Sequence, residues 1–260
     1  MSSFEAAAAN SRLYTNILRA QWPPAVFLIG HVLPEFFRML VYVLIGALVG
    51  GTSGMVFATT GCVVLSTMRA TVSEVSDIPI SDYHSGAIMT VGRNRRGLFW
   101  HYIFRALPLA LVAIVDAVSV TVLLCITTGQ VARLPELLGA LWIVLPAICS
   151  GLAFGFVVVA PAIANDFQNL AHNAAAAILT LTSGAIVPTT ALPTWIAQLG
   201  SLLPFQHTVT ALRLQQAGNP FLASLFHEAL VAFGWMLAAS FVYAWMERRG
   251  RSTGRGLFRT

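Results

Sequence analysis

The chain has 260 residues, of which 57% are hydrophobic and only 10% are charged, and its mean hydropathy is +0.76. A soluble globular domain has about 25% charged residues, so this composition excludes one and indicates a membrane protein. The net charge is +5 and all 15 basic residues are arginine. A chain without lysine cannot carry a Walker A loop, because that loop places a lysine on the nucleotide phosphates.

Six apolar stretches are long enough to cross a membrane, which takes about 20 residues. Backbone groups in lipid must pair within their own segment, so each stretch is predicted to be a helix. The predicted fold class is an all-α integral membrane protein with six transmembrane helices, which form a single transmembrane domain over residues 1–260. The predicted spans are 26–49, 54–72, 102–127, 138–161, 171–190 and 226–246.

The segment before the first span, residues 1–25, is predicted to lie along the inner membrane interface as a helix. Leu13 and Ile17 fall on one helical line, whereas Arg12 and Arg19 fall elsewhere, which is the pattern of an interfacial amphipathic helix. A partly disordered tail is the alternative. The segment lacks the small-residue cleavage site of a secretory signal peptide.

The arginines are distributed very unequally between the two sides of the predicted spans. Twelve lie on one side, Arg133 and Arg213 lie on the other, and Arg38 lies within the first span. The positive-inside rule therefore places both termini in the cytoplasm, together with the long loop 73–101 and the basic tail 247–260. Because the arginines lie at the edges of apolar runs, membrane topology explains the net charge, and no nucleic-acid partner is predicted.

Two predicted spans, the first and the third, carry ionisable residues that we single out as candidates. His31, Glu35 and Arg38 share one face of the first span, and Asp116 lies near the middle of the third. An ionised residue at a span centre costs about 2.5–3.5 kcal/mol, so such groups usually face a partner or water. We expect these residues to line the translocation path or to tie the first span to Asp116, with a structural ion pair near the inner interface as the alternative.

The segment 188–220, between the fifth and sixth spans, cannot form one continuous helix. It is mostly apolar, but prolines at 188, 193 and 204 interrupt it. A short broken hairpin that dips into the outer leaflet satisfies both facts, because irregular backbone is tolerated at that depth where protein buries it or a wet cavity adjoins it. The predicted outer re-entrant gate comprises Gly184, Pro188, Pro193, Trp195, Pro204 and Arg213.

This order of features, with a span ending in Ser-Gly, then Pro, Leu-Pro-x-Trp, a further Pro and Ala-Leu-Arg, resembles the permease subunits of type-2 ATP-binding-cassette exporters. The drug-resistance and nodulation-factor branch is most similar, and the resemblance covers nearly the whole chain. It implies a permease in a bacterial plasma membrane that exports an amphipathic or lipid-like substrate, such as a drug, a glycolipid or a polysaccharide precursor.

The resemblance also implies a coupling helix in loop 73–101 that contacts the ATPase. Asp82 and Gly86 match the family's acidic residue and glycine, and an apolar stretch with a basic end follows. The family's proline is missing, and the basic residues also fit a solvated anchor. A second contact is implied after the fourth span, where ordinary helix capping is the alternative. The candidate ATPase contacts are Asp82, Gly86, Arg93, Arg95, Arg96, Asp166 and Gln168.

The implied partners are a cytoplasmic ATP-binding-cassette ATPase, a second permease copy or a sister permease, and the lipid bilayer. No cofactor is predicted on this chain, since ATP and Mg would bind the ATPase, and no catalytic or metal-binding residue is predicted. The three cysteines fall inside apolar runs and form no C-x-x-C pair, so we interpret them as small apolar side chains.

Three other functions are compatible with parts of the sequence. A proton-coupled secondary transporter would use Glu35, Asp116 and His31 as a relay. Such transporters usually have two similar halves with interrupted helices at matching positions, but the prolines after residue 187 have no counterpart in the first half. An intramembrane serine protease would use the Gly-Thr-Ser-Gly segment 51–54 with His207, but glycine and serine are expected in any tight turn. A membrane scaffold without transport activity is the third.

Overall fold

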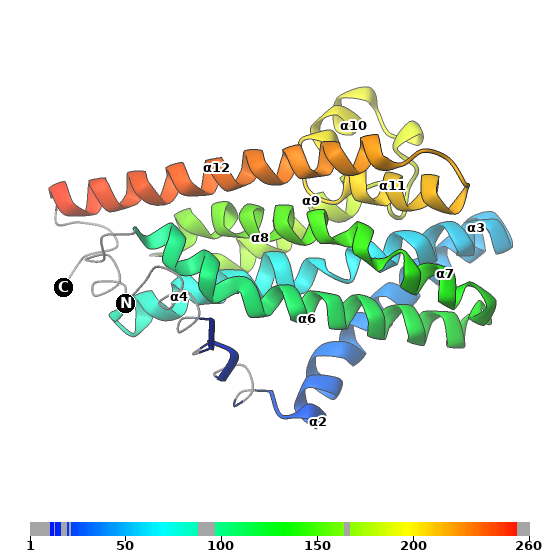
Figure 1. The fold of residues 1–260 in the computed structure, drawn as a ribbon, viewed down its shortest axis with the longest axis horizontal. Helices are drawn as coiled ribbons and strands as arrows, with labels where there is room; N and C mark the ends of the chain where they lie inside the picture. Colours follow the sequence, from blue (N-terminus) through cyan, green and yellow to red (C-terminus); the bar gives the residue numbers. More distant parts are fainter. Residues whose placement is uncertain are drawn as a thin grey trace.

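The computed structural model describes residues 11–12, 14–16, 20, 22–87, 97–163 and 167–253, with side chains up to residue 249. Within these ranges the chain folds into helices joined by turns, without strands, and the helices form an elongated bundle (Figure 1). The protein is therefore an all-helical membrane protein. Four helical stretches of the described part are long and apolar enough to cross a membrane: Pro24–His84, Leu98–Thr127, Leu141–Ala162 and Leu222–Arg249.

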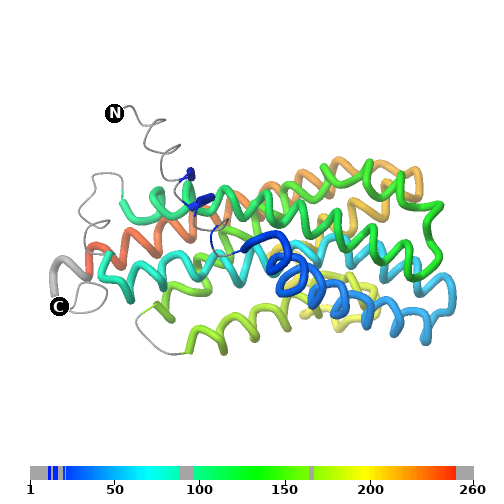
Figure 2. The backbone as a smooth tube through the Cα atoms, turned by 90° about the horizontal axis from the view of Figure 1, so that it is seen from below, coloured from blue at the N-terminus to red at the C-terminus, as the bar shows by residue number. Residues whose placement is uncertain are grey.

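The first of these stretches reverses direction at Gly51, whose φ of 59° and ψ of −143° are not helical. Figure 2 shows the chain running to one end of the bundle and returning beside itself. The two arms pack closely because Gly46 and Gly54 face each other, and a side chain at either position would overlap the backbone of the other. The stretch begins with α2 (Pro24–Phe27), the π-helical turn η1 (Leu28–Val32) and α3 (Leu33–Leu65).

The second arm of α3 forms the centre of the bundle, and its residues from Ala58 to Leu65 are all buried. Its helical path continues beyond residue 72, where the sequence predicted a cytoplasmic loop. Val75, Ile78 and Ile80 are buried and hold this part of the backbone against the bundle. The continuation consists of η2 (Arg69–Ser73), η3 (Glu74–Ser76) and α4 (Asp77–His84).

The next two long helices flank this central arm. Pro108 lies inside the first of them, and the helix continues through it. Gly151 and Gly155 in the second allow close contact with η2 and η3, since an added Cβ would meet Thr71 and Val75. The elements of this part are α6 (Leu98–Thr127), η4 (Val131–Arg133), α7 (Leu134–Gly139), η5 (Leu141–Val144), α8 (Leu145–Val159) and η6 (Ala160–Ala162).

The predicted fifth span, 171–190, is helical only as far as Thr182, and α9 (Gln168–Thr182) has 15 residues. It ends there because Gly184 has a φ of 74° and Pro188 follows, so the chain continues in extended and turn conformations. The broken segment predicted after it contains short helices, as its prolines required. These are η7 (Thr189–Ala191), α10 (Thr194–Ser201) and α11 (Gln206–Gln216), followed by the long α12 (Leu222–Thr253).

The two ends of the bundle carry different elements. Helix α4 lies at one end, near the end of α12, whereas the turn at Gly51 and helix α7 lie at the opposite end (Figure 1). At the α4 end, the rings of Tyr102, Phe156 and Tyr243 pack with centroids 5.7–6.4 Å apart. These rings join α6, α8 and α12 into one unit.

Replacing Gly61 with valine should lower the stability of the bundle. A Cβ at Gly61 would overlap the backbone and side chain of Ala185, and overpacking of this kind typically costs about 1–3 kcal/mol. The measurement is the apparent melting temperature of the purified protein in detergent. Gly234→Val is the matched control, because nothing lies within 4 Å of a Cβ there. Equal melting temperatures for both variants would show that this contact is not needed.

Candidate functional site

A network of ionisable side chains joins the start of the first arm to the bundle. His31, in η1, contacts Asp116 of α6, with 2.7 Å between Nε2 and Oδ2. Its other nitrogen, Nδ1, lies 2.8 Å from Oε1 of Glu74 in η3. The contact with Asp116 is a hydrogen bond, whereas the contact between Nδ1 and Glu74 is a close approach of possible opposite charges without a hydrogen bond.

Two arginines add to these charges, one by contact with Glu74 and the other in a separate ion pair. Arg69 Nε lies 3.3 Å from Glu74 Oε1, and Arg38 Nη2 lies 2.5 and 2.6 Å from the two carboxylate oxygens of Glu35. With His31 protonated, three positive and three negative charges balance, which is the condition for placing them among apolar helices. We call these residues the charge network: His31, Glu35, Arg38, Arg69, Glu74 and Asp116.

The structure therefore divides the four predicted intramembrane residues into two pairs. His31 makes the tie to Asp116, whereas Glu35 and Arg38 pair with each other on the first arm. Sequence reasoning missed Arg69 and Glu74 as members. The sequence does contain a signal for them, because Arg69 and Glu74 flank the apolar end of the predicted second span. The structure shows that Ala70, Thr71 and Val72, which lie between them, are buried.

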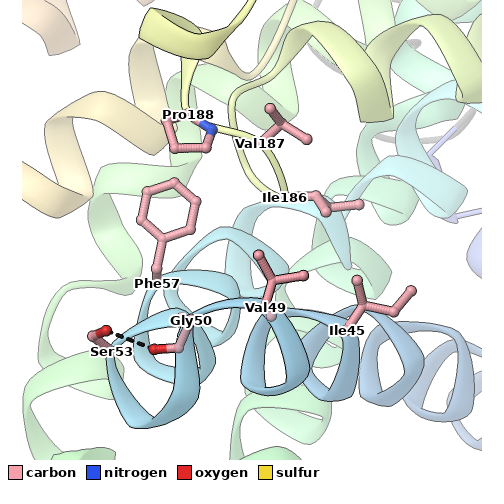
Figure 3. Close-up of a pocket in the computed structure, with 10 residues that line it drawn as sticks. Ile45, Val49, Gly50, Ser53, Phe57, Ile186, Val187 and Pro188 are labelled. Atoms are coloured by element: carbon pink, nitrogen blue, oxygen red, sulfur yellow. Dashed lines mark hydrogen bonds between the residues drawn. The ribbon is translucent and has the colours of Figure 1, made fainter.

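An apolar pocket of about 470 Å³ lies between the two arms of α3 and the segment 186–188. Figure 3 shows Phe57 and Val49 on α3 facing Val187 and Pro188. The hydroxyl of Ser53 donates a hydrogen bond to the carbonyl oxygen of Gly50 at 2.8 Å, so it is already satisfied. The complete lining is Ile45, Gly46, Val49, Gly50, Ser53, Gly54, Phe57, Ile186, Val187 and Pro188.

A second pocket of about 460 Å³ adjoins the first and shares Ile186 and Val187 with it. It lies between the first arm of α3 and α9, and Arg38, Tyr42 and Thr180 are its polar lining residues. We call the two pockets together the α3–α9 groove. The groove thus runs from the charge network to the turn at Gly51, and its polar groups gather at the Arg38 end.

The predicted gate residues have different roles in the structure. Pro188 lines the groove, Pro193 directly precedes α10, and Trp195 is exposed. Pro204 precedes Phe205, which has a φ of 82°. These residues shape the broken segment, as their types indicated.

Arg213 holds the broken segment against α3. Its guanidinium donates to the carbonyl oxygens of Gly184 at 2.7 Å and Ala185 at 3.1 Å, and it lies 3.4 Å from the centroid of the Phe57 ring. Arg213 and Gly184 are therefore in direct contact, which their separation of 29 residues in the sequence did not indicate.

Glu228 of α12 is a second anchor, which sequence reasoning missed. It is fully buried, and its carboxylate accepts hydrogen bonds from the backbone N–H groups of Phe205 at 3.1 Å and Thr208 at 3.2 Å. The Ser150 hydroxyl of α8 donates to it at 2.6 Å. A carboxylate at this position caps the start of α11. The sequence signal that could have identified it is a single acidic residue within the last apolar stretch.

The candidate ATPase contacts are only partly described. Asp82 is 5% exposed, and both of its carboxylate oxygens accept hydrogen bonds from Arg105 Nη1, at 2.6 and 2.8 Å. It therefore points into the bundle and holds α4 on α6. Gly86 follows α4 with a φ of 72°, and Gln168 is the first residue of α9. Arg93, Arg95, Arg96 and Asp166 lie outside the described residues.

The residues considered for a protease are not brought together. Ser53 Oγ donates to Gly50, whereas His207 Nε2 lies 2.9 Å from the carbonyl oxygen of Ser201. The His207 ring stacks on His227, with centroids 5.5 Å apart. Within the described residues, the side chains of Ser53 and His207 form no hydrogen bond with each other, and such a bond is what a serine nucleophile and its base require.

Comparison with known proteins identifies no family for this chain. Neither the scan against protein families nor the search of curated proteins found a match.

Replacing Asp82 with asparagine should destabilise the α4 end of the bundle. The change leaves Arg105 buried without a carboxylate, and breaking a buried ion pair from one side costs on the order of 3–5 kcal/mol. Thermal unfolding in detergent measures the loss. Glu136→Gln, which removes an exposed carboxylate on α7, should leave the melting temperature unchanged. Equal losses in the two variants would contradict the anchoring role.

Replacing Glu228 with glutamine should loosen the start of α11. The amide nitrogen cannot accept a hydrogen bond, so either the N–H of Phe205 or that of Thr208 loses its partner, at a cost of about 1.5–3 kcal/mol. Hydrogen exchange of the segment 202–208 measures the effect, and it should rise relative to the exchange in α6. Ser150→Ala is the control, since it removes a donor but keeps both backbone contacts. Unchanged exchange in Glu228→Gln would refute the capping role.

Proposed function

We propose that this chain is the transmembrane permease subunit of an ATP-binding-cassette exporter that moves an amphipathic or lipid-like substrate out of the cytoplasm. The observation that carries the proposal is the α3–α9 groove, which is apolar near the turn at Gly51 and polar at Arg38. A groove graded in this way suits a molecule with a polar head and an apolar body. The order of motifs along the sequence supports the same function.

In this proposal the chain crosses a bacterial plasma membrane six times. The two arms of α3 are the first two spans, α6, α8 and α12 are three more, and α9 with the extended chain after it is the fifth in order. Helices α10 and α11 form the outer re-entrant hairpin. The α4 end of the bundle and both termini are cytoplasmic, which agrees with the arginine distribution.

The ion pairs offer a route by which a movement of α4 reaches the groove. Asp82 ties α4 to Arg105 of α6, and Asp116 lies 11 residues further along the same helix, about 16 Å away. Asp116 contacts His31 at the start of the first arm, which forms one wall of the groove. An ATPase that displaces α4 would therefore act on the groove through a rigid helix and two buried contacts.

The chain requires partners in this proposal. It has no lysine for a Walker A loop, so a separate cytoplasmic ATPase must bind ATP and Mg. The first arm also leaves Val41, Leu48 and Val49 exposed, and Val49 lines the groove. A second copy of this chain or a sister permease would complete the path from that side.

The test is gentle purification of the C-terminally tagged protein from its native membrane, followed by mass spectrometry of what accompanies it. We expect an ATPase with a Walker A motif in about equal amount, and ATP-dependent export when the complex is reconstituted in vesicles. A well-folded preparation that contains no such ATPase would contradict the proposal. The presence or absence of a different permease in the sample decides between a heterodimer and a homodimer.

One observation favours a second candidate, a proton-coupled secondary transporter. His31 lies between Asp116 and Glu74, and a histidine between two carboxylates can pass a proton from one to the other. The same vesicles separate the two functions. Export driven by a proton gradient without ATP, and abolished in His31→Gln, would establish the second candidate in place of the first.

A further inference from the structure

We propose that the α3–α9 groove binds amphipaths with an anionic head group, such as a phosphate ester, and that Arg38 binds the head group. The inference deepens the proposed function by naming its substrate class, and it rests on that function for transport but not for binding. Three observations carry it: the unused donors of Arg38, the burial of its partner Glu35, and the distribution of polar groups along the groove.

Arg38 has hydrogen-bond donors to spare. Nη2 donates to both carboxylate oxygens of Glu35, and Nε is buried without an acceptor, so it is closed to a ligand. The two N–H groups of Nη1 are left, and within the described residues they have no hydrogen-bond acceptor. The side chain of Arg38 is 36% exposed and lines the groove. A guanidinium has five N–H donors in a planar fork that matches carboxylate and phosphate oxygens. The donors left over suit a bound anion.

The pairing with Glu35 does not remove this preference, because the two side chains are buried to different extents. The side chain of Glu35 is only 2% exposed and lies on the protein side of the guanidinium. A molecule in the groove therefore meets the cation first. A cationic head group would be repelled there, and an uncharged one would gain little from the charge, so the arrangement selects for an anion.

The rest of the groove has the character needed for a hydrocarbon body. Tyr42 and Thr180 add hydroxyl groups to the Arg38 end. Ile45 and Val49 lie on the same helical arm about 10 and 16 Å further along its axis, in the lining of the first, apolar pocket. The polar end and the apolar end are thus separated along one helix, so a single amphipath spans both.

The experiment measures binding by the full-length protein in discs of uncharged phosphatidylcholine. Three fluorescent probes share one acyl chain and differ in the head group, which is a phosphate monoester, a glycerol or a quaternary ammonium. We expect the phosphate probe to bind about tenfold more tightly than the glycerol probe, as one charge-assisted contact provides, and the ammonium probe to bind most weakly. Equal affinities for the three probes would overturn the proposal.

Variants of the ion pair move the preference in opposite directions. Glu35→Gln removes the competing carboxylate and should raise the affinity for the phosphate probe several-fold. The double variant Glu35→Gln with Arg38→Gln removes both charges, which avoids a buried unpaired carboxylate, and should abolish the preference among probes. A role limited to structural stability predicts no gain of affinity in the single variant. Persistence of the preference in the double variant would refute the assignment to Arg38.

Arg133→Gln is the matched control. Arg133 is a partly exposed arginine elsewhere in the bundle, where it donates to Gln130 and Thr60, and its loss should leave the preference unchanged. A second copy of this chain is the alternative occupant of the groove. Disulfide cross-linking between copies through Ile45→Cys, together with no binding of any probe, would replace the ligand proposal with that one.

The outcome for binding is independent of the outcome for the ATPase partner. Equal affinities of the probes alongside a co-purified ATPase would overturn the head-group assignment and leave the permease proposal standing. Selective binding of the phosphate probe without an ATPase would keep the site and remove the energy source. The two proposals therefore fail separately.

Discussion

The bilayer provides no hydrogen-bond partner for a polar group, and this constraint accounts for the main contacts of the structure. Each ionisable residue that the helices carry inward needs an internal partner, and the partners come from other elements. His31 meets Asp116 and Glu74, Asp82 meets Arg105, and Glu228 meets the backbone at the start of α11. Lipid surrounds apolar helices equally well in many arrangements, so these polar contacts contribute much of the specificity with which the helices are arranged.

Small residues decide how closely the helices approach. Gly46 and Gly54 bring the two arms of α3 together, and Gly151 and Gly155 bring α8 against η2. Close approach increases dispersion contacts, which drive helix association in a membrane in place of the hydrophobic effect. The central arm is buried as a result, while the first arm and α9 keep exposed faces beside the groove.

The two kinds of contact have different consequences for movement. The packed aromatic rings and glycine contacts make α6, α8 and α12 a firm support, whereas the first arm is held at its start by His31 and along its length mostly by the other arm. The broken segment depends on two anchors, Arg213 and Glu228. In the proposed exporter, these anchored but separate parts are the ones that would open and close the groove.

The sequence by itself determined the membrane environment, the helical class and the break between residues 49 and 54, because composition and apolar run length report directly on transfer into lipid. It also located the proline-interrupted segment and the intramembrane charges, since proline disrupts a helix and a charge is unfavourable within the bilayer. The ends of the helices depended on tertiary contacts and local turns. The helix after residue 72 continues because Val75 and Ile78 are buried, and α9 stops at Thr182 because a left-handed glycine follows.

Only the tertiary structure decided which charges meet. His31 and Asp116 are separated by 85 residues, and Ser150 and Glu228 by 78, so no helical periodicity could pair them. The inward orientation of Asp82 and the place of Arg38 at the polar end of the groove also depend on how neighbouring helices pack. Local sequence sets the cost of placing a charge in the membrane, but the packing of distant helices determines the partner that offsets it.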